Sequence, residues 1–528
     1  MTATETDADA GASTEAPRTR LARAAVLLAV FVCAACGLVY ELALVALGSY
    51  LIGDTVGQAS IVLSVMVFAM GVGALLAKPL QRRAEAAFAG IEIALALLGG
   101  LSVLLLYAAY AWLSLYVPAL VVIALLLGML IGAEIPLLMV LLQRIRRQDA
   151  GSAVADLFAA DYVGALLGGL AFPFVLLPVF GQVRGALLVG AVNAIAGLGL
   201  VLTVFRKRLR RRTRVVLSAA AVGVTVVLAA TFAFAGQFEL SARQALYADP
   251  VVHAERTPYQ EIVLTESVNL GGPADVRFYL NGDLQFSSVD EYRYHEALVH
   301  PVLSGPHERV LILGGGDGLG LREVLRYPDV RHVTLVELDP EVVRLARSQP
   351  DLLALNQDAF NDPRVQVITA DAFTWLRGNV PQFDAVIVDM PDPDSTATAK
   401  LYSVEFYALV RRSLADGGRL VVQAGSPYFA PRSYWCVESS LREVGLRTVP
   451  YYTSVPSFGD WGFHLATADT EPQLRLSPTA PALRSLDDDS LRAAGVFPVD
   501  RRRIPDVPSS SLMQPRVLEY AKDEWRSY

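Results

Sequence analysis

Hydrophobic residues are concentrated in the first 236 positions of the chain, where they form long runs with few charges. A helical run of about 20 apolar residues matches the thickness of a lipid bilayer. The pattern predicts seven membrane-spanning helices, at about 24–46, 57–77, 87–108, 113–141, 158–180, 185–205 and 215–236. We therefore expect residues 21–236 to form a transmembrane domain. The polar residues 1–20 have no hydrophobic period, which predicts a disordered tail.

From residue 237 onward the pattern is that of a water-soluble protein. Glu261–Thr265 and Val276–Leu280 alternate like β-strands, and Asn281-Gly282 is typical of a two-residue hairpin turn. We expect residues 237–300 to form a small β region with this hairpin.

Residues 301–470 alternate between short apolar stretches and helical ones. The predicted strands are Val310–Leu313, His332–Glu337, Val365–Thr369, Ala385–Val388 and Arg419–Gln423, with helices at about 319–327 and 340–348. This order predicts an α/β doubly wound, Rossmann-like domain with helices on both faces of the sheet. Residues 471–528 are polar, and we expect them to wrap over the surface as a C-terminal extension.

Composition narrows the class of protein further. Of the 528 residues, 53% are hydrophobic and 18% are charged, which fits a chain that lies partly in lipid. A net charge of −7 argues against a nucleic-acid partner. Cys33, Cys36 and Cys436 cannot form a disulfide framework or a zinc site by themselves.

A glycine-rich turn, Gly314–Gly318, follows the first strand of the predicted sheet and would let a ligand approach the backbone, with Gly314 and Gly316 closest to it. Glu337 ends the second strand, where an acid can accept both ribose hydroxyls. Asp371 follows the third strand, where it can accept the amino group of adenine. Together these residues predict a pocket for an adenosyl group.

Asp317 lies inside the glycine turn, where its carboxylate would attract an ammonium and disfavour a ligand that ends in a carboxylate. Decarboxylated S-adenosylmethionine ends in a bare ammonium. The alternative is that Asp317 only caps the following helix.

Three further acids follow the fourth strand, in the loop Asp389–Asp394. Asp389 directly ends an apolar strand, so we expect it to be partly buried and fixed in position. An amine must lose a proton before it attacks carbon, and a fixed carboxylate can accept that proton. A sulfonium is already an activated leaving group, so we expect no metal.

These residues resemble the spermidine synthase family, the polyamine aminopropyltransferases, over about 255–465. The matching motifs are Thr257–Gln260, Leu280–Gln285, Asp290–Glu296, His300-Pro301, Gly314–Gly318, Val336–Asp339, Asp362–Val365, Asp389–Pro393 and Trp461–Phe463. With its membrane half, the chain looks like the integral-membrane branch of that family.

The resemblance implies a role for each matching position. Decarboxylated S-adenosylmethionine would be the co-substrate, putrescine the acceptor and spermidine the product, and relatives suggest a homodimer. The implied residues are Gln260, Glu337, Asp371 and Ala372 for the methylthioadenosine part, Asp317 for the aminopropyl ammonium, Gln285, Tyr294, His295 and Asp392 for the amine, and Asp389 as proton acceptor.

Two departures put the identity of the amine in doubt. The catalytic loop continues as Asp394–Lys400, one residue longer than the Gly-Pro-Ala-Glu of soluble members, and Phe458 stands where a Tyr is common. Two other functions stay open: a methyltransferase that uses S-adenosylmethionine, and a membrane polyamine transporter or sensor with a binding-only domain.

Glu41, Glu92, Glu134 and Asp161 lie in or near the predicted spans, with no Lys or Arg at comparable depth. Acids at such depth face a protein interior, where they are protonated, paired with polar groups or bound to a cation. Because polyamines are polycations, a site for a polyamine substrate or product is one hypothesis, and a purely structural role is the alternative.

The side of the membrane is predicted in two conflicting ways. Basic residues lie before the first run and after the second, fourth and sixth, which places the N-terminus in the cytoplasm and, after seven crossings, the soluble part outside. The donor, however, should be made in the cytoplasm. We therefore expect a multi-pass protein of the cell membrane with a cytoplasmic catalytic domain.

Overall fold

The computed structural model describes residues 17–52, 55–145, 150–206, 208–267 and 274–525. The chain divides into two compact units, Met1–Ala248 and Asp249–Tyr528. Most of the predicted disordered tail, residues 1–16, lies outside the described residues, whereas residues 17–20 already belong to the first helix.

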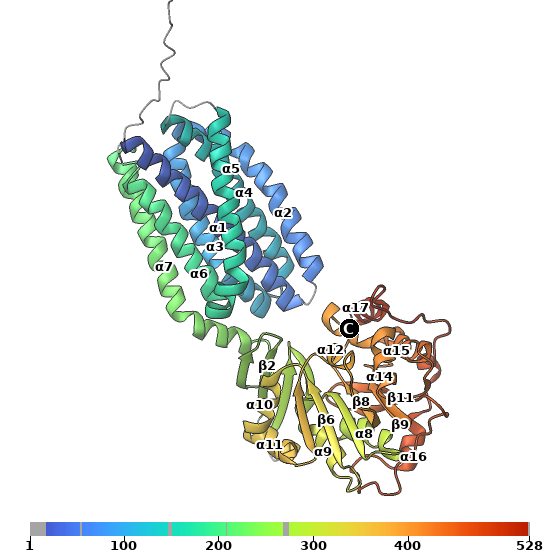
Figure 1. Cartoon of the computed structure of the whole chain (residues 1–528). Helices are drawn as coiled ribbons and strands as arrows, with labels where there is room; N and C mark the ends of the chain where they lie inside the picture. Colours follow the sequence, from blue (N-terminus) through green and yellow to red (C-terminus); the bar gives the residue numbers. More distant parts are fainter. Residues whose placement is uncertain (1–16, 53–54, 146–149, 207, 268–273, 526–528) are drawn as a thin grey trace, which may run out of the picture. The chain divides into compact units, whose positions relative to one another are not determined.

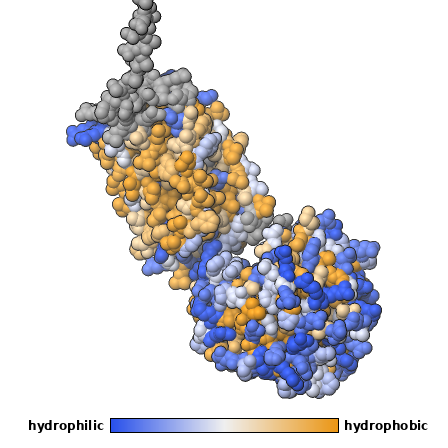
Figure 2. All heavy atoms as spheres, viewed as in Figure 1, coloured by the Kyte–Doolittle hydropathy of each residue, from blue (hydrophilic) through white to orange (hydrophobic). Residues whose placement is uncertain are grey.

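The first unit is a bundle of long helices (Figure 1). Its helices are α1 (Pro17–Ile52), α2 (Thr55–Leu76), α3 (Ala84–Leu113), α4 (Tyr116–Ile145), α5 (Ala150–Ala171), α6 (Leu177–Leu202) and α7 (Arg211–Gln244), with short turns η1 (Lys78–Arg83) and η2 (Phe172–Leu176). Hydrophobic side chains cover most of the visible outer face of this bundle (Figure 2), as expected for a surface in contact with lipid.

Six stretches of the described residues are long and apolar enough to cross a membrane, judged by length and composition. The fifth stretch, Val154–Leu202, has 49 residues. As one straight helix it would be about 73 Å long, more than twice the hydrocarbon thickness of a bilayer. It is not straight, because Gly181 interrupts it with φ 71° and ψ −176°.

The two halves of this fifth stretch run in opposite directions. In α5, Gly164 packs on the backbone of Phe31 and Gly168 on that of Ala35, so α5 runs parallel to α1. Helix α3 is also parallel to α1, and α6 is antiparallel to α3. The pairs that define these directions are Cys33 with Glu92, Tyr40 with Gly99, Ala96 with Gly190 and Glu92 with Gly197.

The second unit begins with a four-stranded antiparallel sheet in the order β1 (Val251–Arg256), β2 (Glu261–Ser267), β3 (Asp275–Leu280) and β4 (Asp283–Ser287). Asn281 and Gly282 join β3 to β4 with φ 53° and 95°, the left-handed values that a tight two-residue turn needs. Helix α7 extends to Gln244, beyond the boundary expected at residue 236.

The larger sheet has seven strands in the order β10-β11-β9-β8-β5-β6-β7. Its strands are β5 (Arg309–Gly314), β6 (His332–Glu337), β7 (Val365–Thr369), β8 (Phe383–Asp389), β9 (Leu414–Gln423), β10 (Arg447–Val455) and β11 (Gly459–Thr467). The first five of these are parallel neighbours and include every strand predicted for residues 301–470. Strands β10 and β11 add an antiparallel edge, so the sheet is mixed.

Helices cover both faces of this sheet, because its central strands are apolar on both sides. Val310 and Ile312 of β5 pack with α8, α9 and α10, whereas Leu311 and Leu313 pack with α12, α14 and α15. The helices are α8 (Glu291–Val299), α9 (Leu319–Leu325), α10 (Pro340–Ser348), α11 (Pro350–Asn356), α12 (Ala372–Leu376), α13 (Thr396–Ala399), α14 (Val404–Arg412), α15 (Pro431–Glu443), α16 (Asp488–Ala494) and α17 (Arg516–Trp525), with η3 (Val302–Ser304), η4 (Ala359–Asn361), η5 (Lys400–Tyr402) and η6 (Val499–Arg501).

The C-terminal extension does more than wrap the surface. Val517 and Leu518 of α17 are buried in the apolar core beside α15, and Phe497 joins the same core. The expectation of a surface segment was incomplete because the few apolar positions of this stretch are spaced along a mostly polar sequence.

Candidate active site

The carboxyl ends of three neighbouring parallel strands bring the predicted site residues together. Strand β5 leads into the turn Gly314–Gly318, β6 ends at Glu337, and β8 ends at Asp389. Gly314 pairs in register with Asp389, so the turn begins directly beside the predicted proton acceptor. This edge is where doubly wound sheets bind ligands.

The glycines of the turn let Glu337 at the end of β6 and Asp389 at the end of β8 approach the turn closely. Gly314 has φ 85°, and a Cβ there would lie 2.0 Å from the carbonyl oxygen of Asp389. A Cβ at Gly316 would lie 2.7 Å from Oε2 of Glu337. Any larger residue at these positions would displace the acids that line the turn.

Glu337 points one carboxyl oxygen at the glycine turn. Its Oε1 accepts the Asp339 N–H at 3.0 Å, which leaves Oε2 at Gly316. Burial raises the pKa of Glu337 to about 7, and the charges of Asp339 and Asp317 add to the effect.

Asp317 caps the helix that follows the turn and places a negative charge beside the turn. Its Oδ1 accepts the Leu319 N–H at 2.8 Å, so the alternative of a local cap at the start of α9 is realised in the structure. Its negative charge also contributes to the raised pKa values of Asp389 and Glu337, which places it near both. Three acids thus surround the turn, an arrangement that favours a cationic ligand.

Asp389 is held by Tyr294 of α8, whose hydroxyl donates to Oδ1 at 2.6 Å. Burial raises the pKa of Asp389 to about 6, and the charge of Asp317 adds to this. His295 and the Tyr294 hydrogen bond act in the opposite direction. The other oxygen, Oδ2, lies over the glycine turn, 3.1 Å from where a Cβ of Gly315 would be.

His295 is fixed by Glu291, one turn earlier in α8. Its Nδ1 lies 2.8 Å from the Glu291 carbonyl oxygen and 2.9 Å from Oε2 of the Glu291 carboxylate. Both are acceptors, so Nδ1 carries a proton. Burial lowers the pKa of His295, but the Glu291 carboxylate outweighs burial and raises the pKa overall.

A second group of acids consists of Asp283 at the start of β4 and of Asp392 and Asp394 in the loop after β8. Burial raises the pKa of Asp392 to about 7, with Asp394 and Asp283 adding repulsion. Much of Asp283 is accessible to solvent, yet surrounding protein atoms and Asp394 raise its pKa to about 6. Positive charge at this place would relieve the repulsion between these acids.

The remaining predicted residues are Gln260, Gln285, Asp371 and Ala372. Gln260 donates to Oδ2 of Asp339 at 3.0 Å, and Gln285 donates to the Asp283 carbonyl at 3.1 Å. Asp371 and Ala372 begin α12, where Asp371 accepts the Thr374 N–H at 2.8 Å and the Lys400 ammonium at 2.7 Å. Burial raises the pKa of Asp371, but these two donors outweigh burial and lower it overall.

Gln423 is a buried polar residue beside Asp392 that the sequence analysis did not single out. It ends β9, is fully buried, and donates to the Met390 carbonyl, to Oδ1 of Asp392 at 3.3 Å and to the Tyr402 hydroxyl at 2.6 Å. Its Oε1 accepts the indole N–H of Trp461 at 3.1 Å. A polar residue at the end of an apolar strand was the available signal for it.

Comparisons with known proteins show which family the chain resembles. A family model described as the spermine/spermidine synthase domain matches residues 291–478. Polyamine aminopropyltransferase 1 of Streptomyces coelicolor is 62% identical over 511 residues, which cover 97% of this chain and 96% of that protein. The polyamine aminopropyltransferase of Mycobacterium tuberculosis is 46% identical, with 95% of this chain and 97% of that protein covered.

The chain belongs to the polyamine aminopropyltransferase family. The family and the enzyme class that the motifs indicated are therefore confirmed. Because the similarity covers nearly the whole chain, it includes the helical unit as well as the catalytic unit. A solved structure of spermidine synthase in complex with the transition state analogue AdoDATO is 24% identical, covers 53% of this chain and 89% of that one, and has a TM-score of 0.43.

Proposed function

We propose that this aminopropyltransferase moves the aminopropyl group of decarboxylated S-adenosylmethionine to putrescine, with Asp389 as the proton acceptor. The observation that carries the proposal is the partly buried Asp389 carboxyl, which is bonded to Tyr294 on one oxygen and faces the glycine turn with the other.

The donor would lie along the glycine turn. Oε2 of Glu337 faces the turn, where it can accept ribose hydroxyls, and ionised Asp317 can accept the aminopropyl ammonium. Asp371 keeps lone pairs for the adenine amino group beside its bonds to Lys400 and Thr374. A donor with its own carboxylate would meet the charge of Asp317, which disfavours the methyltransferase alternative.

The acceptor would lie between two groups of acids. One nitrogen of a diamine would reach Asp389, Tyr294 and His295, and the other would reach Asp392 with Asp283 and Asp394. Gln285 borders the same group through Asp283. Because opposite ends of the amine are held by negative charge, a short diamine fits this arrangement better than a monoamine.

The reaction breaks a carbon–sulfur bond of the donor and forms a carbon–nitrogen bond to the amine. The neutral amine nitrogen attacks the methylene carbon next to the sulfonium, and the carbon–sulfur bond breaks with its electron pair going to sulfur. The proton of the amine goes to Asp389. Orientation and electrostatics supply most of the acceleration, since the leaving group is already activated.

We further propose that the helical unit crosses the membrane seven times. The support is the opposite direction of α5 and α6 and the break at Gly181 within the long fifth apolar stretch. The N-terminus and the catalytic unit would then lie on opposite sides of the bilayer.

Methylthioadenosine release by the purified full-length protein tests the proposed reaction. The protein is given decarboxylated S-adenosylmethionine with putrescine, cadaverine, agmatine or spermidine in separate reactions. We expect release with putrescine, and the common product reports transfer to whichever amine is accepted. S-Adenosylmethionine replaces the donor in the control reaction.

If methylthioadenosine is released only with another amine, that amine is the acceptor instead of putrescine, and the proposed aminopropyl transfer still holds. If the folded protein binds the donor and no amine gives release, the catalytic assignment is wrong and a binding-only polyamine sensor or transporter replaces it. Methyl transfer in the control reaction would favour the methyltransferase.

A further inference from the structure

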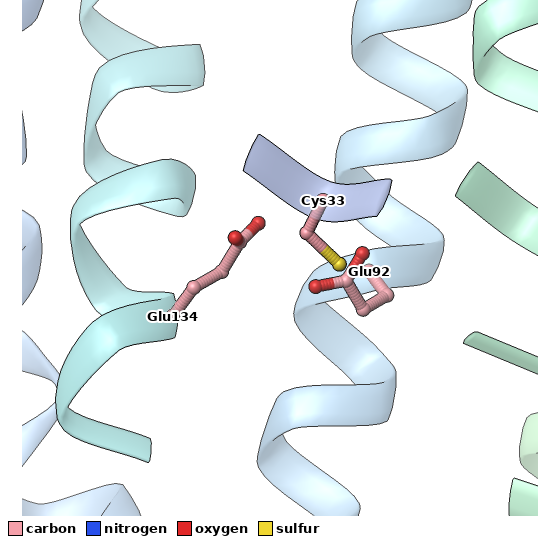
Figure 3. Close-up of side chains that lie close together, drawn as sticks. All are labelled: Cys33, Glu92 and Glu134. Carbon is pink, nitrogen blue, oxygen red and sulfur yellow. The ribbon is translucent and has the colours of Figure 1, made fainter. Parts of the chain in front are cut away.

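The helical unit contains a buried polar cluster that the aminopropyl transfer does not use. Cys33 of α1, Glu92 of α3 and Glu134 of α4 point toward one another (Figure 3). Their sulfur and nearest carboxyl oxygen atoms all lie within 4.8 Å of one another. The exposed fractions of these side chains are 3%, 0% and 5%.

Three carboxyl oxygens of this cluster lack a hydrogen-bond partner among the described residues. Neither carboxyl oxygen of Glu92 has a hydrogen-bond partner among the described residues, and the same holds for Oε1 of Glu134. Two buried carboxyls this close cannot both stay ionised unless a cation lies between them, because the free energy of desolvation is high and the charges repel.

A fourth helix supplies an independent observation. Asn193 of α6 is fully buried, and neither its amide oxygen nor its amide nitrogen has a hydrogen-bond partner among the described residues. The amide lies beside the Glu92 carboxyl, close enough to interact with it but outside hydrogen-bond geometry. A buried amide left unpaired costs free energy, so a missing ligand explains it better than packing does.

The size of the space limits the ligand. Glu92 and Asn193 are 0% exposed to a water-sized probe, so no water-sized void borders either side chain. The carbon chain of a polyamine therefore does not fit without rearrangement, whereas a bare metal ion does. Ligand atoms around tetrahedral zinc lie about 3.3–3.8 Å apart, a modest contraction from the observed spacing.

We propose that Cys33, Glu92, Glu134 and Asn193 bind one divalent metal ion of the zinc class within the helix bundle. One sulfur and three oxygens match the ligand types that zinc accepts, and the sulfur disfavours magnesium and calcium. Binding releases the Cys33 thiol proton to solvent. The metal would join α1, α3, α4 and α6, which gives the helical unit a structural centre of its own.

The test uses the purified full-length protein in detergent, treated with a chelator and then loaded with Zn²⁺ or Co²⁺. We expect about one bound metal per chain after removal of the excess, and a thiolate-to-cobalt charge-transfer band in the near-ultraviolet spectrum. Cys33→Ser should abolish this band, and Glu92→Gln should weaken zinc binding by at least about tenfold.

Two substitutions on α1 serve as matched controls. Cys36→Ser changes a buried thiol whose sulfur contacts the Val189 carbonyl, and Glu41→Gln changes an acid outside the cluster. Both should keep the metal and the band. No bound metal in the wild type, or equal losses in Cys33→Ser and Cys36→Ser, would overturn the proposal. Metal content is read without any assay of transfer, so this outcome is independent of the proposed function.

Discussion

Burial and a neighbouring carboxylate set the proton affinity of Asp389. Its raised pKa of about 6 makes it a stronger base than an exposed aspartate while leaving it mostly ionised at neutral pH. The glycine turn brings the charge of Asp317 close, and Tyr294 limits the shift by donating to the ionised form.

Replacement of Asp389 by Asn should lower turnover by at least about a hundredfold, because the amide cannot accept the proton of the amine. Steady-state release of methylthioadenosine measures the loss. Asp384→Asn is the matched control, since Asp384 lies on the same strand but bonds to the Arg309 N–H at 2.8 Å. Turnover close to wild type in Asp389→Asn would exclude Asp389 as the base.

The Tyr294 hydroxyl should affect the acidic limb of the pH–rate profile, because it changes the pKa of Asp389. Protonated Asp389 cannot act as the proposed base, so its titration should make kcat/KM rise with pH through about 6. The Tyr294 hydrogen bond favours the ionised form, so Tyr294→Phe should raise the pKa and move the limb to higher pH.

Tyr407→Phe is the control for this shift, because the buried Tyr407 hydroxyl has no hydrogen-bond partner among the described residues. Comparing each variant with the wild type cancels the titration of the amine. If the acidic limb of the pH–rate profile stays in place in Tyr294→Phe, or shifts equally in Tyr407→Phe, the limb does not report Asp389.

At the scale of elements, a buried ionic network joins α8 to α9. Arg322 donates to both carboxyl oxygens of Glu291 at 2.9 Å and to Glu323 at 3.0 Å. Glu323 also contacts His300 at 3.0 Å. Glu291 in turn holds His295, so the network connects the packing of the two helices to the site.

Arg322→Met should destabilise the catalytic unit by about 3–5 kcal/mol, because it leaves the buried Glu291 carboxylate without its guanidinium partner, whereas Glu323 keeps its ion pair with Arg326. A lower thermal midpoint of the full chain by scanning fluorimetry would report it. Arg331→Met is the control, since Arg331 and Glu308 form a pair with side chains 71% and 62% exposed. Such pairs contribute about 0–1 kcal/mol, so equal midpoints for the two variants would refute the role of the network.

At the scale of the whole molecule, the number of membrane crossings decides whether the N-terminus and the catalytic unit lie on the same side of the membrane. Arg144 and Arg208 bond to Glu85 at 2.9 and 3.4 Å, so the basic loops after the fourth and sixth predicted spans meet at one end of the bundle. This asymmetry favours a cytoplasmic N-terminus, whereas the supply of donor favours a cytoplasmic catalytic unit.

We expect Ala245→Cys to resist a membrane-impermeant thiol reagent in intact cells, because the donor reaches a cytoplasmic site directly. Ala245 is exposed at the end of α7, and the three native cysteines are buried, so background labelling should be low. Permeabilised cells provide the positive control. Labelling in intact cells would place the catalytic unit outside and require export of the donor.

Much of the fold and part of the site could be predicted from local sequence. The membrane helices and the five parallel strands are readable because burial imposes an apolar period or run on each segment. Glu337, Asp371 and Asp389 could be predicted as site candidates because each ends or follows a strand, and strand ends meet at one edge of a parallel sheet.

Features that depend on distant segments were decided only by the tertiary structure. The Tyr294 partner of Asp389, the contacts of Gln423 and the added strands β10 and β11 arise from contacts between different elements of the chain. The cluster of Cys33, Glu92, Glu134 and Asn193 draws on four helices, and no local pattern links them. Sequence periodicity records which face of an element is buried, but the partners on that face depend on how the chain folds back on itself.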